Sequence, residues 1–139
     1  MALILSEEDL ERFIGQVDFR KGGGLVPIIT QDALSDKVLM QAFMDEEAQR
    51  LTLRTGEMHY WSRSRRRIWL NGEESGNRQI VQNAVLDCGD DTILFKVRQL
   101  GLCCHTGRET CFHKPTLALV ILNEHCETSL TLKAIRQVC

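Results

Sequence analysis

The segment from residue 78 to residue 112 alternates apolar runs with polar clusters. Residues 78–86 and 92–100 are two β-rich runs, joined by Asp87-Cys88-Gly89-Asp90-Asp91. A second polar cluster follows them, Cys103-Cys104-His105-Thr106-Gly107-Arg108-Glu109-Thr110-Cys111-Phe112. Two short alternating runs around a polar tip predict an antiparallel hairpin. Thiolates beside an imidazole suit zinc and grouped carboxylates suit magnesium, so the same segment predicts a metal centre.

Two amphipathic helices are predicted upstream. Ser6 precedes an acidic turn and apolar residues at helical spacing, which predicts a helix over residues 7–19. Asp45 and Gly56 stand where the N-terminal and C-terminal caps of a second helix belong. A short terminal helix is expected over residues 129–138.

The remaining runs predict strands. Residues 25–30 and 38–44 are predicted to form a hairpin, residues 57–64 return to strand, and residues 113–122 contain another apolar stretch. Hairpins rather than βαβ crossovers are expected between strands. Residues 1–139 are therefore predicted to be one α+β domain, built mainly on antiparallel sheet.

Composition narrows the class of protein. A net charge of -2 gives no general attraction to nucleic acid or to an anionic membrane. The apolar runs are far shorter than the ~20 residues needed to span a bilayer. The six cysteines, in a chain with a full-sized core and no export signal, predict reduced thiols and a cytoplasmic location. Cys126 and Cys139 are interpreted as packing thiols.

One dense basic cluster lies in the middle of the chain. Residues 63–67 contain Arg63, Arg65, Arg66 and Arg67, flanked by Trp61 and Trp69. Guanidinium groups suit phosphates and aromatic faces suit bases, so the cluster fits a nucleotide or a single-stranded nucleic acid. A solvated hairpin turn is the alternative. The polar loop over residues 73–77 could hold a ribose or phosphate.

Three cysteines in polar settings are candidate zinc ligands: Cys88, Cys104 and Cys111. Their spacing is not the paired spacing of zinc fingers, and it could arise by chance. Three ligands would leave a position open for water, which is the catalytic arrangement. His105 is the candidate acid/base group, or alternatively it only orders its loop. Asp87, Asp90 and Asp91 could bind magnesium, or they could form a solvated hairpin tip.

These motifs together resemble the phosphoribosyl-AMP cyclohydrolase family of histidine biosynthesis. The resemblance covers residues 25–113 and rests on a set of short runs in unbroken order: Met44-Asp45, Glu47-Ala48, Thr55-Gly56, Ser62-Arg63-Ser64-Arg65, Trp69, Gly72-Glu73, Ser75-Gly76, Gln79, Asp87-Cys88, Gln99, Gly101, Cys104-His105-Thr106-Gly107 and Cys111-Phe112.

The resemblance implies hydrolysis of the N1–C6 bond of the purine ring in phosphoribosyl-AMP. It implies an intertwined homodimer, with zinc held by Cys88, Cys104 and Cys111 drawn from both subunits, and magnesium held by Asp87 and Asp91. Substrate contacts are expected from Arg63, Arg65, Trp69, Glu73, Ser75 and Gly76. His105 is expected to move protons. Neither nucleic acid nor membrane is expected as a partner, and the chain is expected to be monofunctional.

The sequence departs from the family pattern at two places. The family usually reads Asp-Cys-Asp-x-Asp, whereas this chain has Gly89 at the middle aspartate, and either Asp90 or water replaces the missing ligand. Asn71 stands where the family commonly has lysine. Cys103 occupies a usually small, apolar position and is interpreted as a bystander. A zinc-stabilised nucleic-acid-binding module using residues 63–67, and a thiol redox or metal-buffering protein, are the competing hypotheses.

Overall fold

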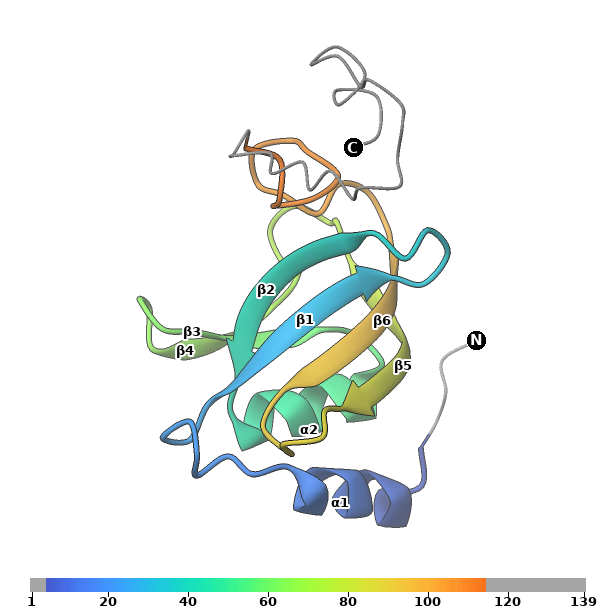
Figure 1. Ribbon diagram of the computed structural model, residues 1–139. Helices are drawn as coiled ribbons and strands as arrows, with labels where there is room; N and C mark the ends of the chain where they lie inside the picture. Colours follow the sequence, from blue (N-terminus) through green and yellow to red (C-terminus); the bar gives the residue numbers. More distant parts are fainter. Residues whose placement is uncertain (1–4, 115–139) are drawn as a thin grey trace, which may run out of the picture.

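A computed structural model describes residues 5–114 of the chain (Figure 1). Within this range the elements are, in order, α1 (Glu7–Gln16), β1 (Val26–Asp32), β2 (Val38–Met44), α2 (Glu46–Thr55), β3 (His59–Ser62), β4 (Arg67–Leu70), β5 (Gln79–Leu86) and β6 (Ile93–Gln99). The predicted helix over residues 129–138, Cys126 and Cys139 lie outside the described residues. So does the predicted apolar stretch over 113–122, apart from residues 113 and 114.

Both upstream helices are present and begin at the predicted caps. The Ser6 hydroxyl accepts a hydrogen bond from the Asp9 N–H group at 3.1 Å, and the Asp45 carboxylate accepts one from Ala48 at 2.8 Å. Gly56 ends α2 in the left-handed region, with φ 73°. Helix α1 ends three residues before the predicted boundary, because Val17 turns to extended backbone with ψ 126°.

The strands form one six-stranded sheet in the order β4-β3-β2-β1-β6-β5. Four of its five pairings are antiparallel, which confirms the predicted α+β class with a mainly antiparallel sheet. The fifth pairing, between β1 and β6, is parallel. The expectation that hairpins alone join the strands is therefore wrong at the centre of the sheet, where partners from distant parts of the chain meet.

The sheet curls so far that its two halves meet. The Met58 N–H group donates to the Gln79 carbonyl at 3.1 Å, and the Val81 N–H group donates to the Gly56 carbonyl at 2.8 Å. These bonds join the start of β5, on one edge of the sheet, to the segment just before β3, on the other half. The curled sheet encloses a core that includes Ile28, Tyr60 and Phe95, all fully buried.

The two ends of the sheet carry different structures. Helices α1 and α2 lie at one end, close to the tip of the β5–β6 hairpin, and the loop of residues 101–114 lies at the other (Figure 1). No helix between residues 5 and 114 has the length and apolar character to cross a bilayer. The separation of the two ends decides how the predicted metal ligands are arranged.

Candidate functional site

The loop of residues 101–114 is held against the start of β2. The Cys111 N–H group donates to the Leu39 carbonyl at 2.8 Å, and the Thr110 hydroxyl donates to the Val38 carbonyl at 2.7 Å. The Cys103 thiol contacts the same Leu39 carbonyl at 3.7 Å. Since both ends of the cysteine-bearing segment are attached to one strand, Cys104 and Cys111 are brought close together.

The three thiols of this loop differ in acidity. The Thr106 hydroxyl, 3.0 Å from the Cys104 sulfur, lowers the pKa of Cys104 to about 6, and His113 acts in the same direction. Burial raises the pKa of Cys103 to about 12 and also raises the pKa of Cys111. Cys104 is therefore the thiol that the protein holds ready as an anion, which is the form that binds metal.

His113 is a neighbour of Cys104 that the sequence interpretation missed. Its Nε2 atom lies 3.8 Å from the Cys104 sulfur and 3.3 Å from the Thr106 hydroxyl. The Cys-x-His spacing from Cys111 to His113 was the available signal, since cysteine and histidine near one another are typical of metal sites. His105 points elsewhere, into the cavity described next.

A cavity of about 650 Å³ opens beside the cysteine loop. Its walls come from the β3–β4 turn, from the polar loop after β4, and from the loop after β6. It brings together seven of the predicted site residues: Arg65, Trp69, Glu73, Ser75, Cys104, His105 and Cys111. A volume of this size fits a nucleotide-sized ligand.

Two predicted substrate residues do not line this cavity. Gly76 adopts a left-handed φ of 77° and its N–H group donates to the Gly72 carbonyl at 2.8 Å, so it shapes the loop. Arg63 lies over the Phe43 ring, with the guanidinium carbon 4.1 Å from the ring centroid. Residues missed by the sequence interpretation include Asn77 and Leu102, which also line the cavity.

Trp69 is held in place by packing. Its ring lies against Tyr60, with centroids 5.3 Å apart and planes tilted by 40°. The turn that follows depends on Gly72, where φ is 79° and a Cβ atom would lie 2.3 Å from the Asn77 carbonyl oxygen. Trp69 thus lines the cavity from β4, and the polar loop after β4 folds back on itself between Gly72 and Asn77.

A buried hydrogen-bond network connects the core to the cysteine loop. The Tyr60 hydroxyl, 2.8 Å from the Thr30 hydroxyl, donates to the side-chain amide oxygen of Gln79 at 2.6 Å. The Gln79 amide nitrogen donates to Gln99 at 2.9 Å and contacts the Cys103 sulfur at 3.6 Å. Tyr60 and Gln79 are fully buried. The network therefore fixes Cys103, and through the backbone it positions the adjacent Cys104.

The remaining predicted metal ligands lie at the tip of the β5–β6 hairpin. The Asp87 carboxylate accepts hydrogen bonds from the N–H groups of Asp91 at 3.0 Å and Thr92 at 3.1 Å. Burial raises the pKa of Asp87, but these N–H groups outweigh it, so the pKa is lowered overall. The Asp91 carboxylate lies 3.8 Å from the Lys21 ammonium group.

Gly89 lies between two of these carboxylates. A Cβ atom on Gly89 would stand 2.9 Å from an Asp91 carboxylate oxygen and 3.6 Å from an Asp87 oxygen. Asp90 has a left-handed φ of 59°, and its carbonyl accepts a hydrogen bond from the Asp18 N–H group at 2.6 Å. The tip thus groups Asp87 and Asp91 around position 89, while Asp90 contributes its backbone to the contact with the α1–β1 connection.

The zinc ligands predicted from the sequence do not meet within one chain. Strand β6 separates Cys88 from the cysteine loop, and its seven residues span about 20 Å (Figure 1). Among residues 5–114, no three histidine, cysteine or acidic side chains come together as a metal site. Within a single chain the predicted zinc ligands therefore fall into two separate groups, one with Cys104 and Cys111 and the other with the exposed Cys88.

Comparison with known proteins gives one consistent result. Residues 40–113 match the phosphoribosyl-AMP cyclohydrolase family. A phosphoribosyl-AMP cyclohydrolase from Nitrosospira multiformis is 59% identical over 92 residues, which are 66% of this chain and 71% of the relative. Enzymes of the same name from Desulfatibacillum aliphaticivorans and Clostridium botulinum are 54% and 45% identical, over 71% and 76% of this chain and 80% and 96% of their own lengths.

Proposed function

Because the chain belongs to the phosphoribosyl-AMP cyclohydrolase family, we propose that it hydrolyses the N1–C6 bond of the purine ring of phosphoribosyl-AMP in histidine biosynthesis. The observation that carries this proposal is the cavity that joins Arg65, Trp69 and Glu73 to Cys104, His105 and Cys111. It combines groups that hold a nucleotide with groups that suit hydrolysis.

The thiols fit a zinc ion if two chains contribute. Cys104 and Cys111 would supply two ligands, with the low pKa of Cys104 favouring the thiolate, and Cys88 of a second copy would supply the third. A bound zinc would supply the Lewis acidity that activates water. The separation of Cys88 from the cysteine loop within one chain supports an intertwined homodimer with a shared site.

The other residues have separable tasks. Trp69 would stack on the purine ring, and Arg65 would bind a phosphate through its guanidinium edge. The Glu73 carboxylate would accept hydrogen bonds from ribose hydroxyls, and the Ser75 hydroxyl would donate to them. The exposed His105 would transfer protons at the ring as it opens. Ribosylation at N1 makes C6 electrophilic, so a zinc of the modest Lewis acidity expected with three thiolate ligands would suffice.

Magnesium is proposed at the hairpin tip. Asp87 and Asp91, which flank Gly89, would be its protein ligands, and water would fill the position that the family usually gives to an aspartate. Asp90 would be at most an indirect ligand, since its backbone is committed to the contact with Asp18. A cytoplasmic location, with reduced thiols, completes the proposal.

The decisive experiment measures turnover of phosphoribosyl-AMP by the purified protein, before and after chelation of metal. We expect about one zinc per chain, new absorbance from the opened ring, loss of activity on chelation and recovery with added zinc. A protein that contains zinc but does not turn over phosphoribosyl-AMP would refute the proposed enzymatic activity and favour a structural role for the metal. Salt-sensitive binding of single-stranded RNA without turnover would favour the nucleic-acid-binding alternative.

Variants of the cysteines test the ligand set. Cys88→Ser, Cys104→Ser and Cys111→Ser should each lose zinc and activity, because a hydroxyl is a poor zinc ligand. Cys103→Ser should keep zinc and serves as the matched control, since it stands next to Cys104 in the same loop. Retention of the metal by all four variants would rule out this assignment.

A further inference from the structure

The charges of the main cavity accommodate one phosphate better than two. Of the described residues that line it, Arg65 is the only guanidinium, and Glu73 and Glu74 bring two carboxylates. The proposed substrate carries two phosphoribosyl arms, each ending in a phosphate. A second phosphate placed beside Glu73 and Glu74 would be repelled, because like charges in a partly enclosed site disfavour one another.

A second hollow adjoins the first. It has a volume of about 600 Å³ and lies against β2, and its lining includes Phe43 and Trp61, which are paired across β2 and β3. The two hollows share Met40, Ser64 and Trp69 in their walls. A ligand could therefore pass from one to the other along Trp69 without leaving the surface of the protein.

Arg63 supplies the second hollow with a cation. Its guanidinium carbon lies over the Phe43 ring, 4.1 Å from the centroid, and among the described residues Arg63 forms no ion pair with a carboxylate. A guanidinium stacked on a ring keeps its N–H edge free for a planar or tetrahedral anion. The β3–β4 turn thus directs Arg65 into one hollow and Arg63 into the other.

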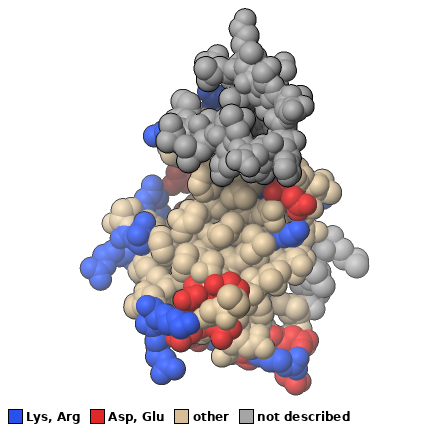
Figure 2. All heavy atoms as spheres, viewed as in Figure 1, with Lys and Arg blue, Asp and Glu red and all other residues tan. Residues whose placement is uncertain are grey.

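Figure 2 shows where this cationic surface lies. Basic side chains gather over the β3–β4 hairpin, on the left of the view. Arg67, which does pair, lies 3.5 Å from Glu73. Residues 59–70 contain four arginines and no carboxylate, and two of these arginines line the hollows, Arg65 the first and Arg63 the second.

We propose that the second hollow is a subsite for the terminal phosphate of one phosphoribosyl arm, bound by Arg63, while Arg65 binds the phosphate of the other arm. The inference rests on the proposed function, because that function supplies a ligand with two arms. Trp69 lies between the two arms and stacks on the purine ring. A two-armed ligand then contacts both arginines, and a one-armed ligand such as AMP contacts one.

The test compares Arg63→Gln and Arg65→Gln with the control Arg66→Gln, which lies in the same turn and lines neither hollow. Binding of phosphoribosyl-AMP and of AMP is measured by calorimetry on chelated protein, and kcat and KM are measured on the zinc-loaded enzyme. Arg63→Gln and Arg65→Gln should each lower the affinity for phosphoribosyl-AMP at least about tenfold, and they should raise KM rather than lower kcat. Arg66→Gln should change neither the affinity nor KM. Only one of the two variants, Arg63→Gln or Arg65→Gln, should lower the affinity for AMP.

Two results would overturn the subsite. One is an Arg63→Gln protein that binds phosphoribosyl-AMP as well as Arg66→Gln does. The other is a loss of AMP affinity as large in both variants as the loss for phosphoribosyl-AMP, which means one shared anion site. Arg63-dependent binding of phosphoribosyl-AMP by a protein that never turns it over would refute the proposed function and uphold the subsite.

Discussion

Neighbouring residues in the cysteine loop have opposite chemical character. Cys103 is packed against Gln79 and the Leu39 carbonyl, and burial raises its pKa to about 12. Cys104 is turned toward Thr106, whose hydroxyl lowers its pKa to about 6. One thiol is thus held neutral to anchor the loop, and the next is held as a thiolate.

The difference predicts the alkylation pattern of the chelated protein. A thiolate reacts and a thiol does not, so the rate of Cys104 modification by iodoacetamide should rise as pH increases through about 6 and then level off. Cys103 should stay unmodified up to pH ~9, well below its raised pKa. Mass spectrometry of the digested protein gives both profiles. Faster labelling of Cys103 than of Cys104 at neutral pH would contradict the assigned acidities.

Single residues could be predicted from the sequence where their chemistry is local. The resemblance to the family predicts Arg65, Trp69 and Glu73 as substrate residues, and the structure brings them to one cavity. Arg63 could not be separated from Arg65 by sequence, because the side of the hairpin that each faces depends on the Phe43 ring of another strand. The contact between Gln79 and Cys103 was equally inaccessible, since 24 residues separate them.

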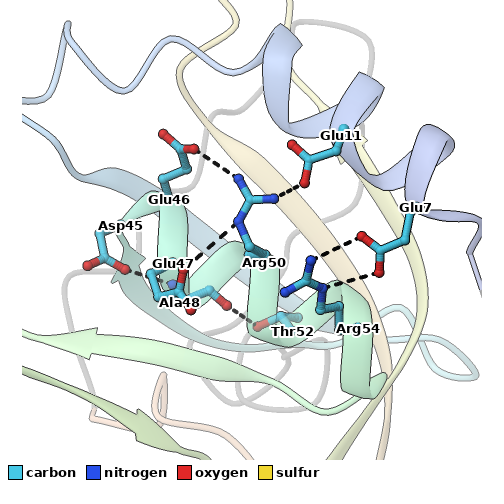
Figure 3. A network of polar contacts seen from close by, with 9 residues as sticks. All are labelled: Glu7, Glu11, Asp45, Glu46, Glu47, Ala48, Arg50, Thr52 and Arg54. Carbon is cyan, nitrogen blue, oxygen red and sulfur yellow. Dashed lines mark hydrogen bonds and ion pairs between the residues drawn. The ribbon is translucent and has the colours of Figure 1, made fainter.

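Helices α1 and α2 are joined by ion pairs across their interface (Figure 3). Arg50 of α2 contacts Glu11 of α1 and also Glu46 at 3.0 Å, and Arg54 contacts Glu7 at 3.0 Å. The Arg50 side chain is 18% exposed, so its pairs are shielded from solvent more than ordinary surface pairs are.

Arg50→Ala should therefore destabilise the protein measurably. We expect a loss of about 1–2 kcal/mol in the free energy of unfolding, above the range for exposed pairs and below that for fully buried ones. Urea denaturation provides the measurement. Arg12→Ala is the control, because Arg12 pairs only within α1 and is 61% exposed, and its effect should stay below ~0.5 kcal/mol. Equal losses in the two variants would show that the interface pairs add nothing.

A substitution at Gly89, in the tip of the β5–β6 hairpin, is expected to strengthen magnesium binding. Gly89→Asp would place a third carboxylate next to Asp87 and Asp91, after Asp91 shifts by a few tenths of an ångström to admit the Cβ atom. An added anionic ligand strengthens magnesium binding, so the affinity measured by calorimetry should rise severalfold. Gly89→Ala, which adds the Cβ atom alone, should show no gain. Unchanged affinity in Gly89→Asp would place the magnesium elsewhere.

Elements were predictable to the extent that their signals lie within a few residues. The caps at Ser6, Asp45 and Gly56 and the hairpin tip at residues 87–91 are short-range features, and all four occur as predicted. The parallel pairing of β1 with β6 has no local signal, because its partners are separated by four other strands of the chain. The curl that joins β5 to the segment before β3 was missed for the same reason.

At the scale of the whole molecule, the positions of the predicted zinc ligands constrain the proposed dimer. The hairpin tip with Cys88 and the loop with Cys104 and Cys111 lie at opposite ends of the sheet (Figure 1). In a two-fold dimer, a contact between the tip of one chain and the loop of the other occurs twice, at two equivalent sites. Folding of one chain would then be insufficient for activity.

Mixed dimers test this arrangement directly. Cys88→Ser and Cys104→Ser should each be inactive alone. A mixed dimer contains one intact site, built from Cys88 of the Cys104→Ser chain and from Cys104 and Cys111 of the Cys88→Ser chain. Its other site has lost the thiols at positions 88 and 104 and keeps only Cys111. Random pairing makes half of the dimers mixed, so co-expression should restore about a quarter of the wild-type activity and zinc content. Cys104→Ser with Cys111→Ser is the matched control, because both changes fall on the same group of predicted ligands and no intact site can form. Activity in that control, or none in the first mixture when mixed dimers are present, would contradict a site shared between two chains.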